Sequence, residues 1–147
     1  MKLFLIALLA LGSINSSSDW LLDFEKAKQV AENDHKYILL NFSGSDWCGP
    51  CIQLHKEIFD NEIFAQFAKE HLVLVNADFP RLKKHALSRE QQKKNDNLAE
   101  TYNKKGVFPL TVLLDAEGRS LYSWEGKPEL SADQFTLQIQ NLTHARN

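Results

Sequence analysis

The chain has 147 residues, of which 44% are hydrophobic and 24% charged, and its formal net charge at neutral pH is -2. This composition is ordinary for a globular protein, and the length fits one compact domain after a short leader. The nearly balanced charge provides no overall attraction to nucleic acid or to an anionic membrane surface, and nucleic acid is not expected as a partner.

The first 18 residues are predicted to be an export signal. Lys2 precedes nine apolar residues, Leu3 to Leu11, and mostly small or polar residues follow up to Ser18. A bilayer-spanning helix needs about 20 apolar residues, whereas this pattern is typical of a secretory signal. We therefore expect residues 1–18 to be removed and residues 19–147 to form the domain, in the periplasm or otherwise exported. The alternative is a buried first strand.

Helical spacing of apolar residues alternates with short apolar runs along the rest of the chain. The elements predicted in chain order are helix 20–33, strand 37–42, a helix from the cysteines to about 60, helix 62–70, strand 72–77, a helix-prone stretch 80–105, strand 110–114, strand 120–124 and a helix opened by residue 131. Asp19, Asn61, Ser88 and Ser131 are the expected N-caps. Residues 115–118 are expected to form a hairpin turn.

This order of elements predicts an α/β fold with one central mixed sheet and helices on both of its faces. Crossover helices make consecutive strands parallel, and the final hairpin adds antiparallel pairing.

Two cysteines, Cys48 and Cys51, stand at the junction between the first strand and the following helix, in the run Trp47-Cys48-Gly49-Pro50-Cys51. They are the only cysteines in the chain, so any disulfide that it forms by itself joins these two. A bridge over two residues constrains almost no chain entropy, which argues against a structural role. The spacing instead favours a reversible redox pair.

On these residues the chain resembles the thioredoxin family, over roughly residues 20–145. Residues 47–51 match the redox signature of the family, Phe108-Pro109 stands where the family carries its cis-proline, and Gly126 matches a glycine beside the active site. A longer loop before the motif resembles exported bacterial thiol:disulfide interchange proteins. The resemblance implies a thioredoxin fold and a redox-active disulfide with no further cofactor.

The resemblance also implies roles for these residues. Cys48, at the start of a helix whose dipole favours a thiolate, is the expected nucleophile, and Cys51 is the expected resolving thiol. Trp47, Gly49 and Pro50 are expected to support the cysteines. A substrate strand is expected to bind beside Phe108, Pro109 and Gly126. The implied partners are cysteine-containing client proteins and a membrane-bound electron donor, and the chain is expected to be a monomer.

The leading functional hypothesis is a disulfide reductase, because the Gly-Pro dipeptide resembles that of reducing thioredoxins. A disulfide oxidase or isomerase on the same fold is the first alternative. The second alternative is a redox-inactive binding module or a Cu(I) carrier that uses Cys48, Cys51 and His55. His55 is otherwise expected at the surface.

The chain departs from the family at two positions. Asn41 stands where thioredoxins have a buried Asp, and Leu74 stands where they have a nearby Lys. We expect a neutral site beneath the cysteines, with the proton of Cys51 handled by Asp46, Glu57 or a water molecule.

The stretch 81–105 contains eight Lys or Arg residues against three acidic ones. It is expected to be a solvated helix face, with steering of an acidic partner as the alternative.

Overall fold

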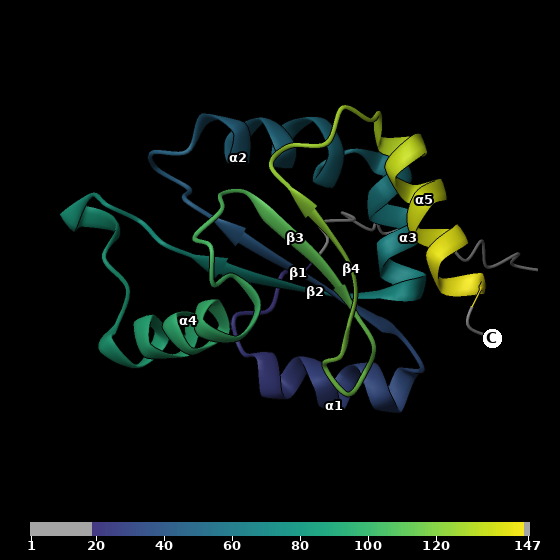
Figure 1. Cartoon of the computed structure of the whole chain (residues 1–147), viewed down its shortest axis with the longest axis horizontal. Coiled ribbons are helices and arrows are strands. Elements are labelled where there is room, and N and C mark those ends of the chain that lie inside the picture. Colours follow the sequence, from purple (N-terminus) through teal and green to yellow (C-terminus); the bar gives the residue numbers. More distant parts are fainter. Residues whose placement is uncertain (1–18, 146–147) are drawn as a thin grey trace, which may run out of the picture.

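The computed structural model describes residues 19–145, so the predicted leader lies outside the described residues. Four strands and five α-helices form the domain, with a π-helical segment (η1) after α2 and a 3-10 turn (η2) before α4 (Figure 1). The elements are α1 (Phe24–Asp34), β1 (Tyr37–Ser43), α2 (Gly49–Leu54), η1 (His55–Phe59), α3 (Glu62–His71), β2 (Leu72–Asp78), η2 (Lys83–His85), α4 (Arg89–Tyr102), β3 (Leu110–Leu114), β4 (Ser120–Glu125) and α5 (Ala132–His144).

The sheet has the strand order β2-β1-β3-β4. β1 and β2 are parallel, as expected for strands joined through helices, whereas β3 runs antiparallel to both β1 and β4. The predicted mixed sheet is therefore confirmed. In its register Asn41 of β1 stands between Asn76 of β2 and Thr111 of β3.

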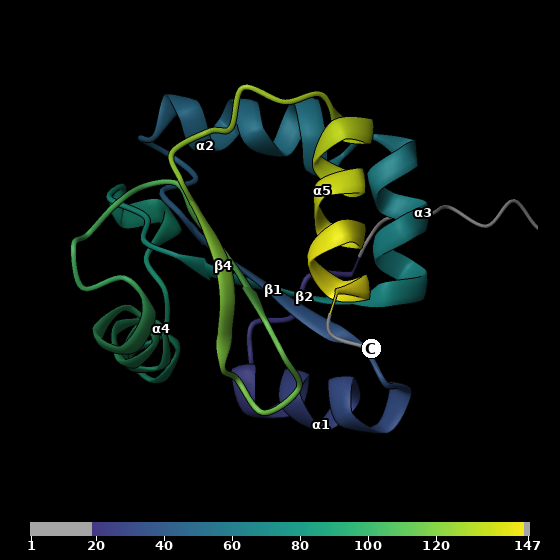
Figure 2. The same cartoon turned by 45° about the vertical axis from the view of Figure 1, so that its right-hand side comes forward.

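Each face of the sheet buries its own apolar core. Helices α1 and α4 cover one face, and α2, α3 and α5 cover the other (Figures 1 and 2). Side chains alternate along a strand, so Leu40 and Phe42 enter the core beneath α1 and α4, whereas Leu39 enters the core beneath α3 and α5. Because β1 is covered on both sides, its apolar run is continuous, as the sequence indicated.

The first helix starts later than predicted. Asp23, not Asp19, caps α1 by accepting a hydrogen bond from the Lys26 backbone N–H. The preceding residues are extended because Leu21 pairs with β2: its N–H donates to Leu74 O over 2.8 Å, and its carbonyl accepts from Asn76 N over 3.0 Å. The predicted helix 20–33 was therefore wrong at its N-terminal end.

The other predicted caps are confirmed. Asn61 accepts a hydrogen bond from Ile63 N, Ser88 accepts one from Gln91 N, and Ser131 forms a capping box with Gln134. Because Ser88 begins α4, residues 79–88 before it form a loop with a single 3-10 turn rather than a helix. None of the helices within residues 19–145 is long and apolar enough to cross a membrane.

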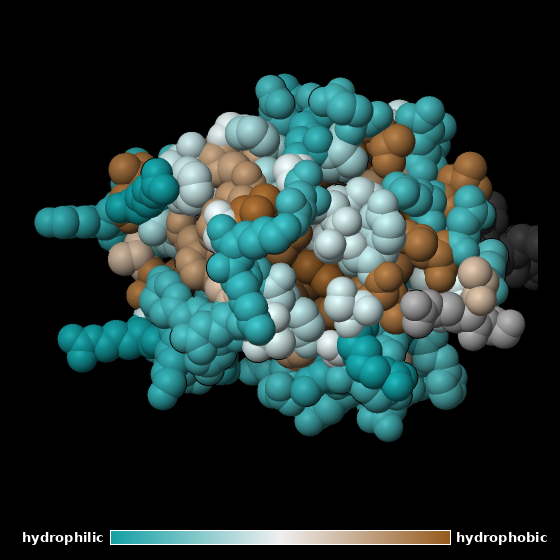
Figure 3. Space-filling view, viewed as in Figure 1, coloured by the Kyte–Doolittle hydropathy of each residue, from teal (hydrophilic) through white to brown (hydrophobic). Residues whose placement is uncertain are grey.

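The surface is mixed in character. Hydrophilic residues dominate the lower edge in Figure 3, where α1 and α4 lie, and apolar residues show through the middle, along the sheet.

Candidate active site

The two cysteines stand at the start of a continuous helical run formed by α2 and η1. In the structure they are joined as a disulfide. Cys48 is the N-cap of α2, and its Sγ accepts a hydrogen bond from the Cys51 backbone N–H over 3.3 Å. Cys48 is 4% exposed and Cys51 is fully buried. The helix start thus directs a backbone donor at the sulfur of Cys48, which favours negative charge there when the pair is reduced.

A tight turn after β1 positions Trp47 beside the cysteines. The Gly44 carbonyl accepts hydrogen bonds from the N–H groups of Trp47 and Cys48, over 3.2 and 2.8 Å. A Cβ atom on residue 44 would lie only 2.3 Å from Cε2 of the Trp47 indole. Glycine is therefore required for the indole to lie against this turn.

The Trp47 side chain connects the cysteine motif to the turn before β3. Its Nε1–H donates to the Phe79 carbonyl over 2.7 Å, and its ring meets the Phe108 ring edge-on with centroids 5.5 Å apart. The Phe108–Pro109 peptide bond is cis, and the Pro109 carbonyl accepts a hydrogen bond from Gly126 N over 2.8 Å. Gly126 has a φ of 77°, a left-handed conformation that favours glycine. Through Trp47, the structure thus connects Phe108, Pro109 and Gly126 to the cysteine motif.

Gly49 and Pro50, between the cysteines, are both exposed. They occupy the first two positions of α2, where the missing N–H of proline costs no helical hydrogen bond. The start of α2 is therefore accessible to solvent at these two residues.

A row of polar side chains crosses the sheet on the face that carries α2. Asn41 is fully buried, and its Oδ1 accepts a hydrogen bond from Thr111 Oγ1 over 3.2 Å. On the other side of Asn41 lies Asn76, whose Oδ1 is buried without a hydrogen-bond partner among the described residues. Leu74, on the same strand as Asn76, is buried in the apolar core. The expectation of an uncharged surface beneath the cysteines agrees with these neighbours.

His55 is not the surface residue that the sequence indicated. Its Nε2 lies 3.3 Å from Nδ2 of Asn41, and its ring packs at centroid distances of 5.3 Å from Trp20 and 5.0 Å from Phe59. The extended segment before α1 carries Trp20 onto the imidazole. Burial lowers the pKa of His55, against smaller opposing effects of the Asp60 and Asp78 charges.

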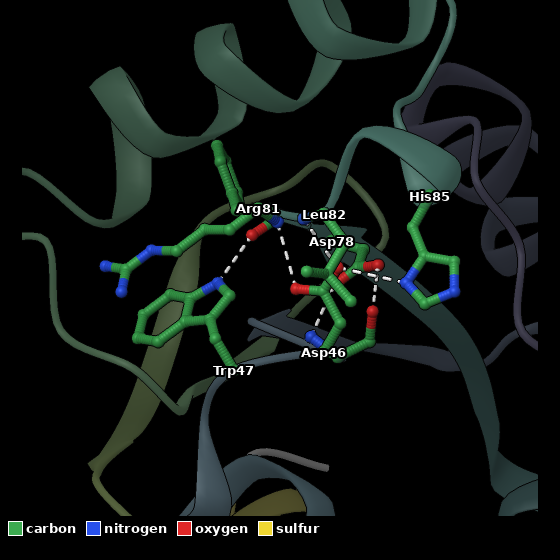
Figure 4. A network of polar contacts seen from close by, with 8 residues as sticks. Asp46, Trp47, Asp78, Arg81, Leu82 and His85 are labelled. Carbon is green, nitrogen blue, oxygen red and sulfur yellow. Dashed lines mark hydrogen bonds and ion pairs between the residues drawn. The ribbon is translucent and has the colours of Figure 1, made fainter.

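The two carboxylates considered for the proton of Cys51 have other partners. Asp46 accepts hydrogen bonds from the N–H groups of Arg81 and Leu82, both over 2.9 Å, and contacts His85 Nδ1 at 3.0 Å (Figure 4). Glu57 pairs with Lys127 at 2.7 Å. The titratable side chain on the inner side of the helix is instead His55, which follows Cys51 by four residues and so shares its helix face.

A cluster of metal ligands was one alternative for these residues. Within the described part of the chain, no three His, Cys, Asp or Glu side chains form a group that could hold a metal ion. His55 Nε2 faces Asn41.

The arrangement as a whole provides two cysteines able to form and break one bond, a backbone donor at the outer sulfur, and an aromatic and backbone surface beside them.

Comparison with known proteins gives a consistent result. The sequence model of a family described as thioredoxin-like domain matches residues 24–143. A curated relative, disulfide bond reductase DsbH of Chlamydia pneumoniae, is 41% identical over 98 residues, which are 67% of this chain and 57% of the relative. The thioredoxin-related protein DsbJ of the same organism is 31% identical over 112 residues, covering 74% of this chain and 31% of DsbJ. The chain thus spans little more than half of one curated relative and a third of the other.

A solved structure described as DsbH oxidoreductase superimposes with a TM-score of 0.79 and 32% identity, covering 96% of this chain and 95% of that one.

Proposed function

This chain belongs to the thioredoxin-like family, and on that premise we propose that it is an exported thiol:disulfide oxidoreductase that reduces disulfides in client proteins. The observation that carries the proposal is the hydrogen bond from the Cys51 N–H to Cys48 Sγ at the start of α2, with both sulfurs in bonding reach. A sulfur in this position is stabilised as a thiolate and has a second sulfur ready to resolve a mixed disulfide. The similarity to a protein named as a disulfide bond reductase supports the same direction.

The reaction has two exchange steps. The Cys48 thiolate attacks one sulfur of the client disulfide, so that this S–S bond breaks, a Cys48–client disulfide forms and one client thiolate leaves and takes up a proton. Cys51 then loses its proton and attacks Cys48. The client leaves as a second thiol, and Cys48 and Cys51 end as the disulfide. Two electrons have passed from the protein to the client, and no cofactor beyond the cysteine pair takes part.

The remaining site residues hold the client and shield the sulfur. Trp47 covers one side of the cysteine motif, and Gly49 and Pro50 leave the helix start open to a partner. An extended client segment binds along the backbone of Phe108 and Pro109. The Pro109 carbonyl is held by a hydrogen bond from the Gly126 N–H. The contact of Trp47 with Phe108 and the hydrogen bond from Gly126 to Pro109 support these roles.

Turnover requires a source of electrons. The oxidised pair is returned to the dithiol by a membrane-bound protein dithiol, which is oxidised to a disulfide in the same exchange chemistry. The apolar N-terminal run supports export to a compartment such as a periplasm, where disulfides persist. The protein acts there as a monomer.

The reduction of insulin by dithiothreitol tests this proposal, with turbidity as the readout. The full chain is expected to accelerate the reaction, and Cys48→Ser to abolish the acceleration completely. Ser120→Ala, at an exposed position where β4 begins, serves as the matched control and should leave the rate unchanged. A wild-type chain with no effect on the rate contradicts the proposal and favours a redox-inactive binding module.

A further inference from the structure

The loop 79–88 between β2 and α4 takes no part in the exchange chemistry described above, yet it is built against the cysteine motif. The Asp46 side chain, only 5% exposed, accepts the two backbone N–H groups of Arg81 and Leu82 and contacts the His85 ring (Figure 4). The N–H bond from Arg81 is the main reason that the pKa of Asp46 is lowered. Asp78, at the end of β2, accepts in addition from Ser45 N over 2.9 Å. Asp46 thus fixes the backbone of the loop, and Asp78 connects the end of β2 to the turn before the cysteines.

The same loop directs cations outward beside the nucleophile. The Arg81 guanidinium lies 3.7 Å from the centroid of the Trp47 ring (Figure 4). Trp47 is the residue immediately before Cys48 in the sequence. A guanidinium over an indole face is held there by the charge distribution of the ring. Because Trp47 also contacts Phe108, Arg81 lies at the edge of the surface proposed to hold the client.

Several cations are exposed on the loop and at the start of α4. The loop contains Arg81, Lys83 and Lys84 and no acidic residue, and Arg89 follows as the first residue of α4, although the whole chain has a net charge of -2. None of these four cations belongs to an ion pair among the described residues, and all four are exposed. Leu82, which stands between Arg81 and Lys83 in the sequence, is 46% exposed. At the place of this loop, on the left of Figure 1, Figure 3 shows hydrophilic atoms with an apolar group beside them.

From these observations we propose that the loop 79–88 is a docking surface for acidic, extended segments of client proteins that carry the disulfide. The inference rests on the proposed reductase function and adds a preference for client charge to it. Exposed cations act over several ångströms and increase the rate at which an oppositely charged partner meets the site. Leu82 adds an apolar contact beside the charges. A protein client, rather than a membrane surface, is favoured because Arg81 is stacked on the residue next to the nucleophile.

Paired peptide substrates test this proposal. Each peptide contains one disulfide, with a fluorophore on one half and a quencher on the other, and the flanking residues are Glu, Lys or Gln. The full wild-type chain is expected to reduce the Glu peptide with the highest kcat/KM. Lys83→Gln with Lys84→Gln should lower that value about fivefold, as expected for the loss of two exposed ion pairs. The Gln peptide should be unaffected, and added salt should remove the difference.

Lys26→Gln with Lys69→Gln is the matched control, because these exposed lysines lie on α1 and α3. It should leave the preference for the Glu peptide intact. Equal kcat/KM values for the Glu and Lys peptides in the wild type would overturn the docking surface. So would a preference that the control pair of substitutions removes equally. Failure to reduce any of the three peptides, the Gln peptide included, would instead contradict the reductase function itself.

Sedimentation with vesicles of phosphatidylglycerol tests whether the loop instead binds an anionic membrane surface. The proposal predicts no difference between wild type and the Lys83/Lys84 variant in vesicle binding. Vesicle binding that is lost in this variant, without a peptide preference in the wild type, would assign the loop to a membrane surface and overturn the proposal.

Discussion

The side-chain nitrogen of Asn41 lies 3.3 Å from Nε2 of His55, beneath the helix that carries the two cysteines. Thr111 donates its hydroxyl to Oδ1 of the same amide, so the amide nitrogen is left to donate to the imidazole. His55 therefore accepts at Nε2 and is neutral, which agrees with the lowering of its pKa by burial. In this thioredoxin-like domain the helix that carries the cysteines lies above an uncharged pair of side chains rather than above a carboxylate.

The first prediction concerns stability against pH. The pKa of His55 is lower in the folded protein than its ordinary value of 6.5, so the unfolded chain binds the proton more readily. The free energy of unfolding should be independent of this group above pH 6.5 and should fall as the pH decreases below it. In urea titrations between pH 7.5 and 5.5, His55→Gln should lose most of this dependence while His144→Gln retains it. Identical slopes in wild type and His55→Gln would show that His55 is not held neutral by the fold.

The second prediction concerns Asn41→Asp. A carboxylate at this buried position cannot donate to Nε2, and its charge favours the protonated imidazole, so the pKa of His55 should rise. We expect a loss of stability of about 1–3 kcal/mol and an altered pH profile for disulfide reduction. Proton NMR of the His55 ring measures its pKa, urea titration measures the loss of stability, and peptide reduction rates measured against pH give the profile. Asn97→Asp, on the exposed side of α4, should change neither. An unchanged pH profile in Asn41→Asp would show that the residue at position 41 does not influence the deprotonation of Cys51.

The third prediction concerns the loop that Asp46 holds. Asp46→Ala removes the acceptor of two backbone N–H groups and of the His85 contact. The loop should open more often, and trypsin should cleave after Arg81, Lys83 or Lys84 on the order of tenfold faster, since cleavage follows the population of the open form. Glu100→Ala, an exposed carboxylate on α4, is the control and should leave the cleavage rate unchanged. Equal cleavage of both variants would mean that other contacts fix the loop.

The fourth prediction concerns the order of attack by the two cysteines. With Cys51→Ala the mixed disulfide on Cys48 cannot be resolved, so client proteins should accumulate covalently bound and be released by reductant. Cys48→Ala is the matched variant, and because Cys51 is fully buried it should trap at least tenfold less. Non-reducing gels followed by mass spectrometry measure both. Equal trapping by the two variants would contradict the assignment of Cys48 as the nucleophile.

Much of the fold could be predicted from local sequence. The strands follow from apolar runs, and the caps at Asn61, Ser88 and Ser131 follow from residue types that satisfy free helix N–H groups. The start of α1 could not be predicted this way. Asp19 and Asp23 are both good caps, and the pairing of Leu21 with β2, which decides between them, is a contact between residues more than 50 positions apart.

The same limit applies to the site. The cysteine motif could be recognised because its residues are contiguous. The position of His55 depends on Trp20 from the chain start and Asn41 from β1, and the position of Arg81 depends on Asp46 and Trp47. Helical spacing of four residues from Cys51 was the only local signal for His55, and spacing alone does not distinguish a buried from an exposed side.

The reduction potential of the Cys48–Cys51 pair tests the account most directly. The full chain is equilibrated in glutathione buffers of defined potential, and the fraction of reduced cysteines is measured by alkylation and mass spectrometry. A reductase is predicted to have a potential closer to the value of about -270 mV known for thioredoxin than to the value of about -120 mV known for a strong periplasmic oxidant. A potential near the latter value, or cysteines that do not equilibrate with glutathione at all, would contradict a disulfide reductase.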